Sequence, residues 1–416
     1  MQIDSGDTAW VLVSASLVLF MTPGLAFFYG GMVRSKHVLS MLAQNFAVIA
    51  VVSIVWLIAG YSLAFSDDVG GGLLGDLHFA GFANPHDPVP GLDLHVPPLA
   101  FAAFQMMFAI ITTALLTGAG ADRMHFDGFL VFAVGWVLVV YVPLAHWAFS
   151  PTGWLAKKGL LDFAGGTVVE INAGASALAL VLVLGSRRGW PREAMAPHSL
   201  PLTLLGAGIL WFGWFGFNAG SALASGDLAA QALIGTHLAA CGGLLGWIAV
   251  ERLATGHATT LGAASGAICG LVAITPGAGF VNSIAALIIG FAAGVVGLYA
   301  VRLKFRLGYD DSLDVVGVHG ICGVVGTLAV GLFATRSVNA VGRGLFDGGG
   351  MHQFGVQALG VVVAIGWAFA GTLLVAYVVH KTVGLRVDDA TELQGLDMAI
   401  HAETAYEHGL GGSTPR

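Results

Sequence analysis

Eleven long runs of apolar residues, separated by shorter polar segments, make up most of the chain. A helix needs about 20 apolar residues to cross the hydrocarbon core of a bilayer. The runs span residues 8–30, 43–65, 99–119, 126–148, 166–185, 201–219, 229–251, 259–275, 281–302, 315–334 and 355–381. The eighth run is short and is bounded by Pro276. The pattern predicts an all-α polytopic membrane protein with eleven transmembrane helices.

The eleven predicted helices divide into five, five and one. We predict two inverted five-helix repeats, over about 8–185 and 201–334, and a last helix at 355–381. Repeats with an odd number of helices insert in opposite orientations, and such folds place a substrate site near the bilayer midplane between the repeats. Residues 1–383 then form one transmembrane domain, and the polar residues 384–416 form a tail.

Lysine and arginine are distributed unequally between the two sides of this predicted bundle. One side holds 13 of the 17: Arg34, Lys36, Arg123, Arg187, Arg188, Arg192, Arg252, Arg302, Lys304, Arg306, Lys381, Arg386 and Arg416. The other side holds Lys157, Lys158, Arg336 and Arg343. Basic loops stay in the cytoplasm, so we expect the N-terminus outside and the C-terminus inside a plasma or inner membrane. The acidic 66–98 loop then lies outside. We interpret it as a solvated loop, and the less favoured alternative is that its carboxylates weakly attract cations.

Composition agrees with a membrane location. The chain is 56% hydrophobic and 10% charged, whereas soluble domains carry about 25% charged residues. The 61 glycines suit closely packed membrane helices. Cys241, Cys269 and Cys322 lie in apolar runs without the spacing of a zinc site or a disulfide framework, so we interpret them as buried structural residues. Asp4 and Asp7 precede the first run with no basic residue, so that run is expected to be retained rather than cleaved.

Two glycine-rich stretches in the fifth and tenth runs contain ionisable groups. Asp162 precedes Glu170 by eight residues, and Asp311 precedes His319 by eight residues. An ionisable side chain at membrane depth costs about 2.5–3.5 kcal/mol on insertion scales, so it is a functional candidate. The matched spacing leads us to expect that Glu170 and His319 occupy equivalent positions in the two repeats and face each other.

Structural roles are the alternatives for these residues. Glu170 could be a buried acid that only packs, with Asn172 or Thr167 as its hydrogen-bond partner. His319 could be a satisfied core histidine. Asp162 precedes a helix and is expected to cap its N-terminus, in addition to favouring a cation by its charge.

Six motifs stand out along the chain: TPGLAFFYGGMVRSKHVLSML (22–42), FQMMFAIIT (104–112), LDFAGGTVV (161–169), WFGFNAGSA (214–222), GVHGICGVVGT (317–327) and the tail segments TVGLRV and GLD. Together they resemble the signatures of the ammonium transporter family, Amt/Mep/Rh, and specifically its Amt/Mep branch. The resemblance implies eleven spanning helices in two inverted halves, a homotrimer with one pore per protomer, and ammonium or methylammonium as substrate. It implies no cofactor, no metal and no nucleic acid.

The resemblance also assigns roles to individual residues. Phe108 and Phe217 match the stacked pair that closes the pore from outside, and Trp214 and Ser221 match residues of the outer vestibule. The remaining matches are Asp162, the acid below that vestibule, and His319, the second histidine of the twin-histidine pair.

Two positions depart from the family pattern. Glu170 stands at the first twin-histidine position, an exchange that some fungal members share. Phe149 stands where a vestibule tryptophan usually follows the PLAHW motif, and Trp154 lies five residues further on. The outer cation site is therefore expected to be weakened or rebuilt.

These residues suggest how a hydrated cation is carried. Aromatic faces and a hydroxyl, from Trp214, Phe108, Phe149 and Ser221, hold ammonium outside. Glu170 then accepts a proton and passes it towards His319, ammonia crosses the apolar pore, and transport is electrogenic.

The alternative is an ammonium sensor that passes little substrate, although no output domain is recognisable in the 416 residues. A PII-type signalling protein is the regulatory partner that the resemblance implies at the cytoplasmic face. An enzyme is not expected, because the HExxH and GxSxG motifs are absent.

Overall fold

The computed structural model describes residues 2–406, and within that range it is built from helices without a β-strand. Ten helices in the described chain are long and apolar enough to span a membrane, and Thr260–Ile274 is a shorter apolar helix. The ten are Ser5–Met32, Ser35–Phe65, Pro98–Ala119, Phe126–Lys157, Gly166–Leu184, Leu200–Gly220, Asp227–Thr255, Ser283–Leu307, Val316–Phe333 and His352–Thr382. All eleven predicted spans are thus confirmed as helices, including the short eighth one.

The helices are named in chain order. The first half contains α1 (Ser5–Met32), α2 (Val38–Val55), α3 (Tyr61–Phe65), α4 (Pro98–Ala119), α5 (Phe126–Trp136), α6 (Val142–Phe149), α7 (Trp154–Lys157) and α8 (Asn172–Leu184). The second half contains α9 (Leu200–Gly220), α10 (Asp227–Thr255), α11 (Thr260–Ile274), α12 (Ser283–Ala300), α13 (Leu303–Leu307) and α14 (Cys322–Phe333). After these come α15 (His352–Thr382), α16 (Asp389–Gln394) and α17 (Leu396–His401).

Short π-helical and 3₁₀-helical segments lie between or beside these α-helices. Between residues 2 and 406, four π-helical segments occur, at Trp56–Gly60, Val137–Tyr141, Gly166–Ile171 and Val316–Ile321. Three 3₁₀ segments occur at Ser35–His37, Ala80–Phe82 and Leu345–Asp347. The segments Gly166–Ile171 and Val316–Ile321 begin the fifth and tenth spans and contain Glu170 and His319. Such π-helical turns often occur at functional sites.

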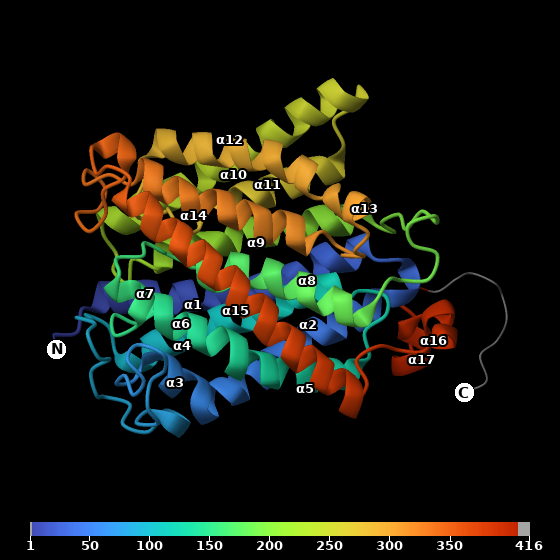
Figure 1. Ribbon diagram of the computed structural model, residues 1–416, viewed down its shortest axis with the longest axis horizontal. Coiled ribbons are helices and arrows are strands. Elements are labelled where there is room, and N and C mark those ends of the chain that lie inside the picture. Colours follow the sequence, from blue (N-terminus) through green and yellow to red (C-terminus); the bar gives the residue numbers. More distant parts are fainter. Residues whose placement is uncertain (1, 407–416) are drawn as a thin grey trace.

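The long helices lie side by side in one bundle, and α15 crosses the others obliquely (Figure 1). The N-terminus and the C-terminal tail lie at opposite ends of this bundle (Figure 1), as an odd number of spans requires. The helices α1 and α9, which begin the two proposed repeats, pack against each other. Their approach is close, because a Cβ atom on Gly206 would lie 2.1 Å from the backbone nitrogen of Phe28.

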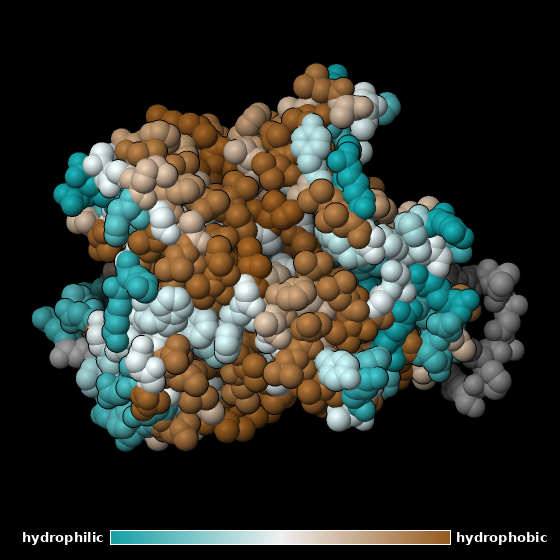
Figure 2. Space-filling model, in the orientation of Figure 1, coloured by the Kyte–Doolittle hydropathy of each residue, from teal (hydrophilic) through white to brown (hydrophobic). Residues whose placement is uncertain are grey.

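The surface has an apolar middle and polar ends. Figure 2 shows hydrophobic residues over the sides of the bundle and hydrophilic residues gathered at its two ends. Large apolar side chains on the sides are exposed, among them Phe20, Phe212, Phe291, Val362 and Leu374. A soluble monomer rarely exposes so much contiguous apolar surface, whereas a bilayer solvates it. The molecule is a multi-pass membrane protein.

The two ionisable stretches have the same local structure. A carboxylate oxygen of Asp162 accepts a hydrogen bond from the backbone nitrogen of Thr167 at 2.8 Å. A carboxylate oxygen of Asp311 accepts one from the backbone nitrogen of Val316, also at 2.8 Å. In both cases the acid lies five residues before the amide that it binds. This correspondence supports the proposed inverted repeat.

The tail is folded against the bundle as far as residue 406. Asp397 accepts hydrogen bonds from the backbone nitrogens of Leu39 at 3.0 Å and Ser40 at 2.8 Å, at the start of α2. Arg386 forms an ion pair of 2.9 Å with Glu392. The end of the predicted tail, 407–416, lies outside the described residues.

Candidate functional site

Two cavities lie within the bundle, and each is lined by one member of a stacked pair of phenylalanines. We call them the outer and the inner cavity, because the basic-residue distribution predicts that the first opens to the outside. The outer cavity is lined by Leu92, Phe101, Gln105, Phe108, Ala148, Phe149, Asp162, Phe163, Ser221 and Leu223. The inner cavity is lined by Met21, Leu25, Phe28, Ile111, Leu115, Val169, Glu170, Leu210, Trp214, Phe217, Ile268 and His319.

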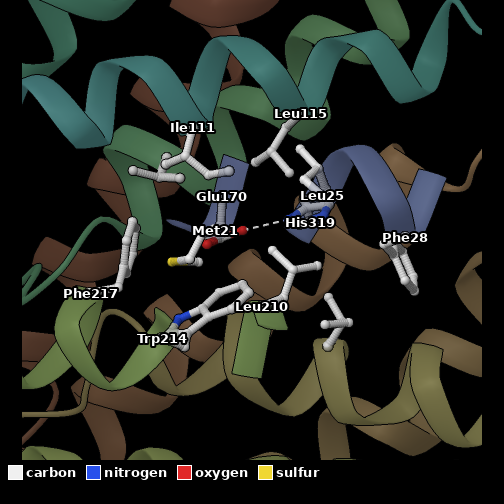
Figure 3. Close-up of a pocket in the computed structure, with 12 residues that line it drawn as sticks. Met21, Leu25, Phe28, Ile111, Leu115, Glu170, Leu210, Trp214, Phe217 and His319 are labelled. Atoms are coloured by element: carbon white, nitrogen blue, oxygen red, sulfur yellow. Dashed lines mark hydrogen bonds and ion pairs between the residues drawn. The ribbon is translucent and has the colours of Figure 1, made fainter. Parts of the chain in front are cut away.

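The inner cavity is narrow and almost entirely apolar. It has room for about one water-sized molecule, with a volume of about 10 Å³. Phe217 lies at one end and Phe28 at the other, with Glu170 and His319 between them (Figure 3). Helices α1, α4, α9 and α11 supply most of its apolar side chains, and the π-helical segment Gly166–Ile171 adds Val169. A small neutral molecule fits this passage better than a hydrated ion, because a bare charge in an apolar environment is strongly disfavoured.

Glu170 and His319 meet in this cavity, as the spacing predicts. A carboxylate oxygen of Glu170 lies 2.7 Å from Nδ1 of His319, although the residues are 149 positions apart (Figure 3). Both are buried, with 1% and 4% of their surface exposed. The backbones come close, since a Cβ atom on Gly323 would lie 2.8 Å from Cβ of Glu170.

The partners proposed for a purely structural Glu170 are engaged elsewhere. The hydroxyl of Thr167 donates to Asp162, and the amide of Asn172 donates to the carbonyl oxygen of Val168 at 3.0 Å. The sequence-based alternative is therefore wrong about these two partners, and His319 is the group that binds the Glu170 carboxylate.

Phe108 and Phe217 stack between the two cavities. Their ring centroids are 4.2 Å apart with planes inclined by 18°. Phe108 lines the outer cavity and Phe217 lines the inner one, so the stacked rings form the partition. Phe149 meets Phe108 edge to face at 6.3 Å on the outer side.

The outer cavity is larger and more polar, with a volume of about 140 Å³. The Ser221 hydroxyl lines it and donates to the carbonyl oxygen of Phe217 at 2.8 Å, so its own oxygen is free to accept. Phe108, Phe149 and Asp162 line it with Ser221, so the structure brings together four of the five residues that we proposed for the outer site.

Trp214 is the exception among the expected outer residues. It lines the inner cavity, and its indole nitrogen donates to Thr275 Oγ1 at 2.9 Å. The reason is helical geometry. Trp214 precedes Phe217 by three residues on α9, and this places it about one turn further along the same face, away from Ser221.

Asp162 caps the helix that carries Glu170, as predicted. Its carboxylate accepts hydrogen bonds from the backbone nitrogens of Gly165 at 3.0 Å, Gly166 at 2.5 Å and Thr167 at 2.8 Å. Gly165 has φ of 119°, a left-handed conformation that favours glycine. The same carboxylate lines the outer cavity, so the structural role does not exclude an electrostatic one.

Gln105 is a polar residue of the outer cavity that the sequence analysis did not single out. Its carbonyl oxygen Oε1 is buried without a hydrogen-bond partner. The residue lies in the FQMMFAIIT motif, three positions before Phe108, so the two share a face of α4. The spacing between Gln105 and Phe108 was the sequence feature from which a place for Gln105 in this cavity could have been predicted.

Within residues 2–406, no group of three or more His, Cys, Asp or Glu side chains forms a metal site.

Comparisons with known proteins agree with one another. A model of the Ammonium Transporter Family matches residues 9–406. An ammonium transporter of Mycobacterium tuberculosis is 48% identical, with 99% of this chain and 92% of that protein covered. An ammonium transporter of Bacillus subtilis is 46% identical, with 97% and 99% covered. The crystal structure of Saccharomyces cerevisiae Mep2 superposes with a TM-score of 0.88 at 36% identity, covering 94% of this chain and 89% of that one.

Proposed function

Because this chain belongs to the ammonium transporter family, we propose that it binds ammonium in the outer cavity, deprotonates it at Glu170 and passes ammonia through the inner cavity. Ammonium transport follows from the family, and the individual steps are our proposal. The observation that carries them is the buried 2.7 Å contact between Glu170 and His319 in an otherwise apolar passage.

The outer cavity is suited to a small cation. Phe108 and Phe149 present aromatic rings, which attract a cation through their electron-rich faces. Ser221 and Gln105 offer oxygen acceptors for N–H groups, and Asp162 contributes negative charge at the cavity wall. Trp214 takes part from the inner side of the stacked rings rather than from the vestibule.

The phenylalanine pair acts as the gate. The stacked rings of Phe108 and Phe217 separate the two cavities. Their rotation lets the ion reach Glu170, where its proton is removed. Ammonia then continues past Leu25 and Leu115, whose apolar side chains do not stabilise a charge.

The proton is held by the Glu170–His319 pair as a unit, because two groups in such close contact titrate together. Glu170 is the acceptor nearer to the gate along the proposed path, and His319 receives the proton from it. The proton leaves on the side of His319, so each cycle moves one positive charge and produces a current. A carboxylate at this position provides an ion-pairing base that a second neutral imidazole would not.

The test is current in liposomes after ammonium pulses and, separately, potassium pulses. We expect Glu170→Gln to reduce the ammonium current by at least about 100-fold, since a positioned base contributes about 10²–10⁴-fold to proton transfer. Glu170→His is expected to alter the current, because an imidazole replaces the carboxylate. Potassium is expected to give none.

The exposed acid Glu193 supplies the matched control, Glu193→Gln, with current at the parental level. An ammonium current of parental size in Glu170→Gln would exclude Glu170 as the proton acceptor. The sensor alternative is not favoured, because the Mycobacterium tuberculosis and Bacillus subtilis relatives, which cover 97–99% of this chain, are both named as ammonium transporters. Ammonium binding without any current in the parent protein would revive it.

We also propose a homotrimer in a plasma or inner membrane, with the N-terminus outside and the C-terminus cytoplasmic. Exposed apolar residues on α9 and α12, such as Phe212 and Phe291, supply surface for contact with lipid or with a second protomer. The folded tail, α16 and α17, borders the loop between α1 and α2 and provides a cytoplasmic face for a PII-type partner.

A further inference from the structure

Two buried cysteines lie next to each other beside the pore. Cys269 on α11 and Cys322 on α14 are free and fully buried. Both sulfur atoms approach the point at which a Cβ atom on Gly297 of α12 would lie, at 2.5 Å for Cys269 and 3.3 Å for Cys322. Gly297, having no side chain, therefore leaves one shared space that two thiols occupy.

The groups around this thiol pair favour a soft metal ion bound by two sulfur atoms. Cys322 donates a weak hydrogen bond to the carbonyl oxygen of Ala293 at 3.6 Å. Among the described residues, no third His, Cys, Asp or Glu joins the two thiols in a metal-binding group. A tetrahedral zinc site is thus incomplete, whereas soft ions such as Cu(I) are selected by thiolates.

The thiol pair is close to the groups that form the inner cavity. Cys269 directly follows Ile268, which lines that cavity. Cys322 follows His319 by three residues, less than one helical turn. An ion held by both sulfurs would therefore join α11 to α14 and fix the helix that carries His319.

We propose that Cys269 and Cys322 form a buried two-coordinate site for one thiophilic metal ion, and that its occupation stops transport. With mercuric chloride as the probe, two sulfur–mercury bonds form while the two mercury–chlorine bonds break, so two thiol protons and two chloride ions are released and no electron is transferred. Mercuric chloride is a neutral molecule, so it does not carry a charge into the apolar surroundings of the site.

The experiment uses the full chain in liposomes, treated with an excess of mercuric chloride and then washed free of unbound reagent. The third cysteine, Cys241, is partly exposed and is removed first by Cys241→Ser. In that background we expect one mercury per chain by mass spectrometry, loss of both remaining thiols from a thiol count, and at least a 10-fold loss of ammonium current. A dithiol chelator is expected to restore the current.

Adding Cys269→Ser or Cys322→Ser to this background is expected to leave a current that mercury does not inhibit. Two mercury ions per chain, or inhibition that persists in either serine variant, would overturn the proposal, and so would a full current with the bridge occupied. If a serine variant does not fold, crystals of the parent chain, which retains all three cysteines, decide the matter after they are soaked in mercuric chloride. One anomalous mercury peak between the two sulfurs supports the site, and a peak at Cys241 alone refutes it.

Discussion

At the scale of single residues, the wall of the outer cavity contains oxygen atoms that can accept hydrogen bonds from a bound ion. The carbonyl oxygen of Gln105 is buried without a partner, and a buried acceptor without a donor is unfavourable by about 1–3 kcal/mol. An ammonium ion offers four N–H donors and a positive charge. We therefore propose Gln105, together with Ser221 and Asp162, as a group that favours the ion in this cavity.

Replacing Gln105 should weaken ammonium binding more than it slows turnover. A hydrogen bond to a charged group contributes about 1.5–3 kcal/mol, so Gln105→Leu is expected to raise the KM for ammonium by about 10-fold or more. The maximal current should stay within about two-fold, since Glu170 is untouched. Uptake measured over a range of ammonium concentrations checks this, with Met106→Leu as the control on the same helix. An unchanged KM would remove Gln105 from the cation site.

At the scale of elements, one helical segment from each proposed repeat meets the other at a glycine, which has no side chain. A Cβ atom on Gly174 of α8 would lie 2.1 Å from Cα of Gly320, in the segment that carries His319. No L side chain fits there without moving one backbone. This close crossing is what brings Glu170 and His319, four and one residues away from the two glycines, within hydrogen-bond distance.

Gly174→Ala should accordingly separate the two segments. We expect a loss of about 1–3 kcal/mol in stability from overpacking, together with a reduced ammonium current. Gly366→Ala on α15 is the control, because a Cβ atom there meets nothing within 4 Å. Thermal unfolding in detergent and current in liposomes measure the two effects. If Gly174→Ala matches Gly366→Ala in both assays, the crossing does not set the position of the pair.

At the scale of the whole molecule, charges are placed at the two ends and almost excluded from the middle. At the C-terminal end, Asp310 is fully buried and binds Arg187 through Nε at 3.0 Å and Nη2 at 2.8 Å. Arg187 also lies 3.6 Å from Asp122. These contacts join the loop after α8 to the loop before the tenth span, and so they hold the two halves together.

This ion pair should make stability depend on acidity. Burial alone would raise the pKa of Asp310, but its hydrogen bonds and charge contact with Arg187 outweigh burial and hold the pKa below its ordinary value. A lowered pKa in the folded state adds stability above the unfolded pKa of about 3.9, and that stability is lost as the pH falls through the folded value. The Tm of the parent protein should therefore fall as the pH drops below about 4.

Asp310→Asn should lower the Tm at pH 7 and flatten its dependence on acidity. Removing one partner of a buried pair costs about 3–5 kcal/mol. Asp389→Asn is the control, since Asp389 pairs with Arg188 at the surface and exposed pairs contribute little. Thermal unfolding between pH 3 and pH 7 makes the comparison. An Asp310→Asn curve parallel to that of the parent would show that another group governs acid unfolding.

The sequence alone determined the number and order of the spans and the helix containing each ionisable group, whereas some limits differ: the second span was predicted over 43–65 and the structure has Ser35–Phe65. The reason is that each helix must by itself supply enough consecutive apolar residues to cross the bilayer, and this length can be read from the local sequence. The matched spacing even indicated that Glu170 and His319 would meet.

Only the tertiary structure decided which faces of the helices pack against one another. It put Trp214 on the inner side of the phenylalanine pair, added Gln105 to the outer cavity and joined Cys269 to Cys322. Hydropathy does not encode these contacts, because every face of a buried membrane helix is apolar. The rotation and crossing of such helices are set by where glycines let two backbones touch.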